Sequence, residues 1–96
     1  MMKEKLKYLT HTLAKEAGYQ ISEIRFVRAQ QSPCALLAKL INQEDSEIIA
    51  LYNSGKTLHF RVAVGSPLDK WWNGLDIQRQ NKILWHNDRM IKSQPL

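Results

Sequence analysis

The sequence predicts an α+β fold, in which an N-terminal and a C-terminal helix pack on an antiparallel sheet of three or four strands. Apolar residues recur every three or four positions near both ends of the chain, which is typical of amphipathic helices. Between these ends, apolar and polar residues alternate, which is typical of strands with one buried face. A chain of 96 residues without an internal repeat or a linker predicts one small domain over 1–96.

The first helix is expected over residues 2–17. Spacings of 4, 3, 4 and 4 separate the members of its apolar stripe, which are Met2, Leu6, Leu9, Leu13 and Ala17. Gly18 follows directly, in the position where a left-handed residue commonly ends a helix.

A strand is expected over residues 21–29, because this segment alternates and is rich in β-branched and aromatic types. Ile24 and Phe26 share one face, and Arg25 and Val27 share the other.

Two further strands, 47–53 and 57–65, flank a short turn and are predicted to form a hairpin, with Gly55 at positive φ. In the second of these strands, one face is expected to join the core and the other to meet solvent or a ligand. The core face consists of Leu58, Phe60, Val62 and Val64, and the other face of His59, Arg61 and Ala63.

Segment 33–42 fits two structures. Ser32 followed by Pro33 is a good helix start, and the alanines and leucines after it are strong helix formers. However, a short, almost wholly apolar run that ends in a polar turn is also typical of a buried central strand. The strand is slightly favoured.

The last third of the chain predicts two helices. Ser66 and Pro67 start a short helix that ends at Asn73-Gly74, and Asp76 caps an amphipathic helix over 77–92. The resulting order of elements is similar to that of small double-stranded-RNA-binding-type domains, in topology alone and with no matching residues.

Composition predicts a cytoplasmic protein without membrane contact. Fourteen Lys and Arg residues stand against nine Asp and Glu, for a formal charge of +5. No apolar run approaches the ~20 residues of a membrane helix, and no apolar signal segment follows the basic N-terminus. Cys34 is the only cysteine, so no internal disulfide can form.

No catalytic, metal or cofactor motif is recognisable, so no cofactor and no metal are expected. The histidines (His11, His59 and His86) are expected on three different elements, without metal-ligand spacing. Cys34 is expected to be a buried small hydrophobe, and the acidic residues near position 45 a solvated turn. The chain is therefore predicted not to be an enzyme. A compact ribonuclease-type toxin, with His59 or His86 as its base, is the enzymatic alternative.

A basic stripe on the predicted last helix is the strongest functional signal. It consists of Arg79, Lys82, His86 and Arg89, at spacings of 3, 4 and 3, which fall within an arc of about 80° at 100° per residue. Trp85 and Lys92 border it, and Arg61, Arg25 and Arg28 extend it if the sheet lies alongside. Cations next to an aromatic ring suit phosphates and bases, so a small binding module for a polyanion, most simply nucleic acid, is predicted. A plain solvated helix face is the alternative.

Trp71 and Trp72 suggest a different function. Adjacent helical residues point about 100° apart, so one ring is expected to pack against Leu68 and the end of the sheet while the other is partly exposed. The capping register slightly favours Trp72 as the exposed ring. An exposed Trp is a common interface anchor. The alternative function is therefore a protein-interaction module, such as a phage-type inhibitor or a small accessory subunit, that uses this pair and a sheet edge.

Overall fold

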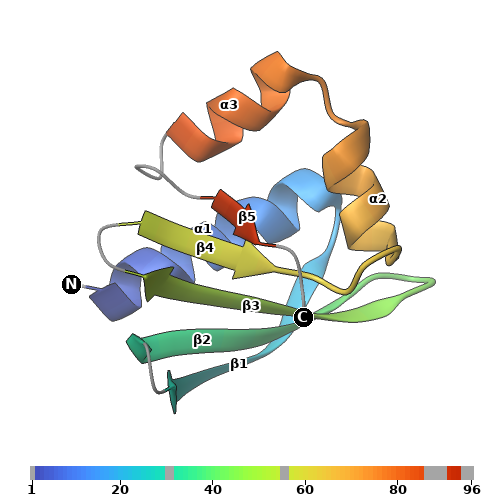
Figure 1. The fold of residues 1–96 in the computed structure, drawn as a ribbon. Coiled ribbons are helices and arrows are strands. Elements are labelled where there is room, and N and C mark those ends of the chain that lie inside the picture. The colour runs from blue at the N-terminus through green and yellow to red at the C-terminus, as the bar shows by residue number, and fades with distance from the viewer. Residues whose placement is uncertain (1, 30–31, 55–56, 86–90, 94–96) are drawn as a thin grey trace.

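The computed structural model describes residues 2–29, 32–54, 57–85 and 91–93, and its strands form one sheet in the order β1-β2-β3-β4-β5 (Figure 1). Strands β1 to β4 pair antiparallel, and β5 pairs parallel to β4. The predicted α+β class with its antiparallel sheet and flanking helices is confirmed. The elements are α1 (Met2–Ala17), β1 (Gln20–Ala29), β2 (Ser32–Ile41), β3 (Ser46–Ser54), β4 (Thr57–Arg61), α2 (Pro67–Gly74), α3 (Ile77–Trp85) and β5 (Ile91–Ser93).

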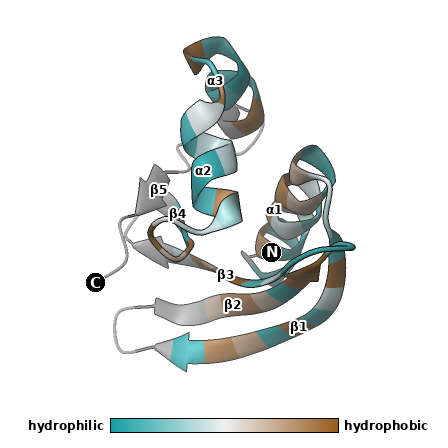
Figure 2. Ribbon diagram, turned by 90° about the vertical axis from the view of Figure 1, so that its right-hand side faces the viewer, coloured by the Kyte–Doolittle hydropathy of each residue, from teal (hydrophilic) through white to brown (hydrophobic). Residues whose placement is uncertain are grey.

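The three helices cover one face of the sheet, where the core lies (Figure 2). Each helix contributes apolar side chains that pack against those of the strands, and this removal of apolar surface from water is the main stabilising term. The core consists of Leu6, Leu9, Leu13, Ala14, Leu36, Ala38, Leu40, Ile49, Leu51, Phe60, Val62, Leu68, Trp72 and Ile83.

Helix α1 begins and ends as predicted. Its leucine stripe is fully buried, and Thr10 within the buried face satisfies its hydroxyl by donating to the Leu6 carbonyl at 2.8 Å. Gly18 adopts a φ of +80°, and the amide of Tyr19 donates to the Ala14 carbonyl at 2.8 Å. These features form the Schellman motif that the position of Gly18 predicted.

Segment 33–42 is a strand, as slightly favoured, but its second face is partly exposed. Leu36, Ala38 and Leu40 lie in the core, whereas Leu37 and Lys39 are exposed. The run is almost wholly apolar because both faces of β2 carry apolar side chains, although helices cover only one of them.

The predicted hairpin forms, but its second strand is shorter than expected. Strand β4 ends at Arg61, Val62 remains buried, and Val64 is 68% exposed. The prediction of Val64 as a core residue is therefore wrong, because Gly65 turns the chain with a φ of +76° and Ser66 already starts the next helix. Gly55 lies outside the described residues.

Both predicted caps in the last third are present. The Ser66 hydroxyl accepts from the Asp69 amide at 3.2 Å, and the Asp76 carboxylate accepts from the Arg79 amide at 2.7 Å. Each side-chain oxygen satisfies an amide that has no partner within its own helix.

The prediction of one helix over 77–92 is wrong in its last part. Helix α3 is described to Trp85, residues 86–90 lie outside the described part, and Ile91–Ser93 form β5. The seven-residue spacing of Ile77, Leu84 and Ile91 fits a helix in isolation. However, the outer edge of β4 offers unpaired backbone groups, and β-branched Ile91 suits a strand there.

Candidate nucleic-acid interface

The structure describes two of the four residues of the basic stripe. Arg79 and Lys82 are exposed on α3, and Trp85 is the last described residue of that helix. Lys92 lies in β5, beside β4, and His86 and Arg89 lie outside the described residues. Arg79 is engaged in an ion pair with Glu16 of α1. Lys92 therefore does not continue the helix that carries Arg79 and Lys82, and the common surface of the four stripe residues stays a prediction.

The face of the sheet opposite the core carries a different set of side chains. Directly paired residues of neighbouring strands point to the same face, so the strand register defines rows across the sheet. We call this surface the open face, because the described helices all pack on the other side. Three rows on β1 to β4 are Val27-Ala35-Tyr52-His59, Arg25-Leu37-Ala50-Arg61 and Glu23-Lys39-Ile48.

An aromatic and cationic cluster lies at the β3–β4 side of the open face. The rings of Tyr52 and His59 stack with 5.1 Å between their centroids and 10° between their planes. The guanidinium carbon of Arg61 lies 5.9 Å from the centroid of the Tyr52 ring, within the range of a cation–π contact. All three side chains are half-buried. This cluster therefore combines two stacked rings with a positive charge on neighbouring strands.

The β1–β3 side of the open face is apolar at its centre and charged at its margin. Leu37 is 37% exposed and Ile48 is 57% exposed. A shallow hollow beside them has Arg25 and Lys39 in its wall. Glu23 lies 4.0 Å from Arg25, and both side chains are mostly exposed, so this ion pair is weak.

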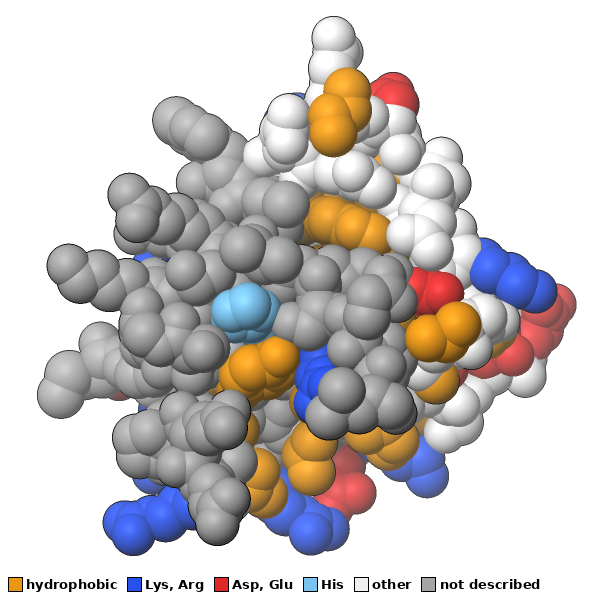
Figure 3. Space-filling model, viewed as in Figure 1, with side chains coloured by type: hydrophobic (Ala, Val, Ile, Leu, Met, Phe, Trp, Pro, Cys, Tyr) orange, Lys and Arg blue, Asp and Glu red, His pale blue; other side chains and the backbone are white. Residues whose placement is uncertain are grey.

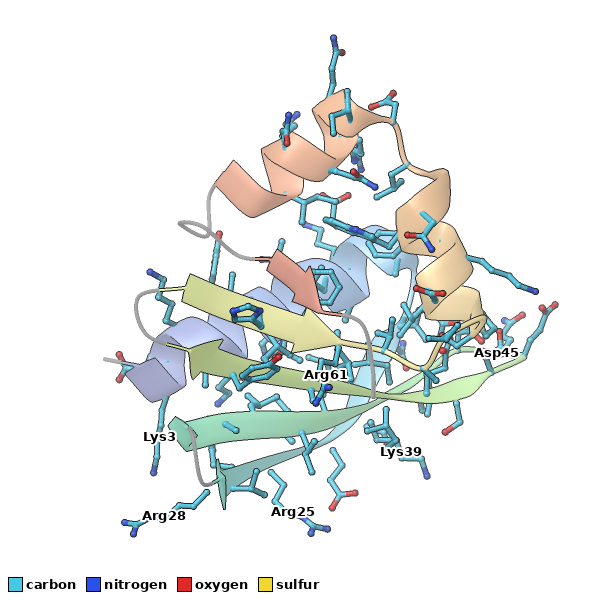
Figure 4. The ribbon with its side chains drawn as sticks, viewed as in Figure 1. Lys3, Arg25, Arg28, Lys39, Asp45 and Arg61 are labelled. Carbon is cyan, nitrogen blue, oxygen red and sulfur yellow. The ribbon has the colours of Figure 1, made fainter. Side chains whose placement is uncertain are left out.

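Basic side chains outnumber acidic ones among the described residues of these three rows. Arg25, Lys39 and Arg61 are basic, and Glu23 carries the one carboxylate. Figure 3 views the sheet with α1 behind it and shows hydrophobic side chains next to Lys and Arg over the strands. Figure 4 shows Arg61 near the middle of the sheet and Arg25 at its lower margin.

The strand β1 margin adds two further cations. Arg28 is exposed near the end of β1, as Figure 4 shows. The Lys3 ammonium of α1 lies 5.4 Å from the centre of the Phe26 ring. Arg61, Arg25 and Arg28 thus lie on one sheet, and the expectation that they extend the basic stripe of the last helix stays a prediction.

The tryptophan pair divides as predicted, with the roles reversed. Trp72 is 5% exposed and meets Phe60 edge to face, with ring centroids 5.1 Å apart. Trp71 is half-buried and lies 6.0 Å from the Trp72 ring. The preference for Trp72 as the exposed ring is wrong, because the α2 face with Leu68 and Trp72 is the face that turns to the sheet. Trp72 is a core residue, and Trp71 alone offers surface.

A polar cluster joins the turn between α1 and β1 to β3 and α2. The Tyr19 hydroxyl donates to Glu47 Oε2 at 2.8 Å, and the Leu68 amide donates to the same oxygen at 3.0 Å. Burial, and next the hydrogen bond to Glu47, raise the pKa of the Tyr19 phenol well above 10.0. Glu47 is thus not part of a solvated turn but holds the start of α2 against β3.

Among the described residues, no group of three His, Cys, Asp or Glu side chains could hold a metal ion. His11 is exposed on α1, His59 lies on β4, and His86 lies outside the described part. The backbone of Cys34 lies in β2.

Tyr52 is the residue that sequence reasoning missed. Its alternation with Leu51 indicates that it points away from the core, but the register that brings it onto His59 and near Arg61 is a property of the paired strands.

Comparison with known proteins yields no match, whether with family models, curated proteins or solved structures. Within the described ranges, no helix combines the length and apolar character that crossing a membrane requires.

Proposed function

We propose that this chain is a non-enzymatic binding module that docks a polyanion, most simply nucleic acid, on the open face of its sheet. The observation that carries the proposal is the cluster of Arg61, Tyr52 and His59 on a face that no described helix covers. A rigid sheet that presents aromatic rings and cations together meets the two needs of nucleic-acid binding, which are phosphate neutralisation and contact with bases.

Charge supports a polyanionic partner. Arg25 and Lys39 are exposed on the open face, and Glu23 is the only carboxylate in its rows. A positive surface attracts phosphates at long range, and each neutralised phosphate releases counterions, which strengthens binding at low salt. Because Cys34 is the only cysteine, the chain needs no oxidising compartment, which supports a cytoplasmic location where nucleic acid is accessible.

The protein-interaction alternative has weaker support. It relied on the tryptophan pair and a sheet edge, but Trp72 is a core residue. Strand β1 forms the outer edge, with register shifts at Ile21/Glu23 and Val27/Ala29 and exposed charges between them. Bulges and charges on an edge strand discourage the addition of another strand.

The test compares two variants with equal charge change. Arg25→Glu with Lys39→Glu reverses two charges on the open face, and Lys70→Glu with Lys82→Glu reverses two exposed charges on α2 and α3. Binding of labelled single-stranded and duplex DNA and RNA is followed by fluorescence anisotropy at ~50 mM salt and above.

We expect the open-face variant to lose affinity about tenfold more than the helix variant. Wild-type affinity should fall with salt at a slope of about −0.7 to −0.9 per phosphate contacted. A larger loss in the helix variant would place the contact on the α2–α3 side and refute the assignment to the open face. No measurable binding to any of the nucleic acids at ~50 mM salt would refute the proposal.

A further inference from the structure

We infer that helix α1 carries a second docking surface, which binds the phosphate backbone of double-stranded nucleic acid. This surface, the outer face of α1, consists of Lys7, Tyr8, His11 and Lys15. The inference rests on the proposed function for the class of its ligand, but it uses no residue of the open face. The two proposals can therefore be refuted separately.

The side chains of the outer face of α1 are accessible to a ligand. Lys7, His11 and Lys15 are exposed, and Tyr8 is 59% exposed. Within the described part of the chain, none of these four side chains takes part in an ion pair, a hydrogen bond or a ring contact. A phosphate that approaches this face therefore does not have to displace a partner within the protein.

The packing of α1 on the sheet holds this face outward. At 100° per residue, Lys7, His11 and Lys15 fall within an arc of about 80°, and Tyr8 borders that arc. The buried leucines of the helix lie on the opposite side, in the core against the strands: Leu6, Leu9 and Leu13. Because burial of the leucines fixes the rotation of α1, the basic side chains are presented together without any ligand.

The basic side chains form a regular row along the helix. Successive members are four residues apart, which is a rise of about 6 Å, so Lys7 and Lys15 lie about 12 Å apart along the axis. One strand of a duplex carries a phosphate every ~3.4 Å of its axis, so a row of this length faces about four phosphates. Two ammonium groups and an imidazole can each donate to such oxygens.

Acidic side chains do not cancel the charge of this row. The helix has two glutamates, of which Glu16 is paired with Arg79 of α3. Glu4 lies one turn before the row, at the N-terminal end of α1. Lys7 and Lys15 therefore give the outer face a net positive charge, which complements a phosphate backbone.

A duplex fits this face better than a protein or a single strand does. Tyr8 is the only large apolar side chain exposed on the described part of α1, so the face lacks the apolar centre of a protein interface. A duplex holds its phosphates in a fixed row, whereas a single strand has to be ordered to match the row of cations. That ordering costs binding free energy.

The outer face of α1 and the open face lie on opposite sides of the sheet. Helix α1 packs on the core side, behind the strands in Figure 1. The molecule measures 32 × 28 × 25 Å, and a duplex has a persistence length of about 150 base pairs. A duplex that lies along α1 therefore does not bend around the molecule to the open face, so the two surfaces contribute to binding independently.

The experiment neutralises the row and compares it with a matched control. Lys7→Gln with Lys15→Gln removes two charges from α1, and Lys70→Gln with Lys82→Gln removes two exposed charges from α2 and α3. Glutamine is a good helix former, and far-UV circular dichroism verifies that each variant is folded. Fluorescence anisotropy gives the affinities of the full chain for a DNA duplex, an RNA duplex and a single strand of equal length, at ~50 mM salt and above.

We expect the α1 variant to lose about tenfold more affinity for a duplex than the control variant, and to lose less for the single strand. For the DNA duplex, the dependence of log affinity on log salt should become less steep by about 1.8, which is about 0.9 for each of two phosphates.

Equal losses in the α1 variant and its control, with both duplexes, would overturn the inference, and so would a loss at least as large for the single strand. If Arg25→Glu with Lys39→Glu then still weakens binding, the proposed function stands. A loss confined to the α1 variant would support the inference and refute the assignment to the open face. Absence of binding to every probe would refute both proposals.

Discussion

Replacing Trp72 with alanine removes an indole ring from the contact between α2 and β4. The ring is 5% exposed and packs edge to face on Phe60, which is itself 2% exposed. Trp71, the adjacent residue, is only half-buried and touches the core from one side. The Trp71→Ala variant therefore serves as a control with the same chemical change on the same helix.

The expected magnitude follows from burial. A fully buried aromatic side chain removes roughly 150–250 Å² from water, which at about 25 cal/mol/Å² corresponds to about 4–6 kcal/mol. Measured losses for Trp→Ala in cores are about 3–5 kcal/mol, so we expect about 4 kcal/mol for Trp72→Ala. A chain of this length has a free energy of unfolding of about 5–14 kcal/mol. Trp71→Ala, whose side chain is less completely buried, should lose less than Trp72→Ala.

Urea unfolding followed by far-UV circular dichroism measures both losses without depending on tryptophan fluorescence. The midpoint should fall further for Trp72→Ala than for Trp71→Ala, at similar slopes. If Trp72→Ala is too unstable to fold, Trp72→Phe should be folded with a smaller loss, because a ring remains against Phe60. Equal midpoints for the two alanine variants, or a lower midpoint for Trp71→Ala, would refute the assignment of Trp72 to the core.

Two further predictions concern the backbone and pH. Gly18→Ala should lower the free energy of unfolding by about 1–2 kcal/mol, because Gly18 has a φ of +80°. Gly74→Ala should raise it by about 0.4–1 kcal/mol, because Gly74 has an ordinary φ and no atom lies within 4 Å of the added carbon. Urea midpoints of the two variants that move in the same direction would contradict this prediction. Because the pKa of Tyr19 is raised in the folded chain by burial and by Glu47, the folded state retains a proton that the unfolded state loses above pH 10. This contribution to stability is complete below pH 10 and declines as pH rises further. Above pH 10, the free energy of unfolding of Tyr19→Phe, measured by urea unfolding, should therefore decline less steeply with pH than that of the wild type. Identical slopes for the wild type and the variant would refute the argument.

Local patterns were sufficient to predict most elements of this fold. The leucine stripe and Gly18 predicted α1 with both its ends, and Ser66 and Asp76 predicted the starts of α2 and α3. Such signals depend on residues within one or two turns of each other, so they act the same way in a short segment and in the folded chain. The α+β class followed from the change of period along the chain.

Segments whose residue pattern fits both a helix and a strand could be assigned only from their tertiary contacts. Apolar residues on both faces of β2 fit a strand or a helix, and the pairing with β1 and β3 selects the strand. Ile91 fits the apolar side of a long helix, but it pairs with His59 on β4. Local propensity differs by less than about 1 kcal/mol per residue between such alternatives, so contacts with distant strands decide between them.

The candidate site was the part least accessible to sequence reasoning. Alternation along β4 indicated that His59 and Arg61 share a face, and this is a property of one strand. Tyr52 joins them because β3 pairs with β4 in one register, and Arg25 joins their surface through two further registers. Residue types and their faces are thus determined by the sequence along each strand. Which faces meet is decided only in the tertiary structure, because a shift of one residue in any of these registers would turn the side chains of that strand to the other side of the sheet.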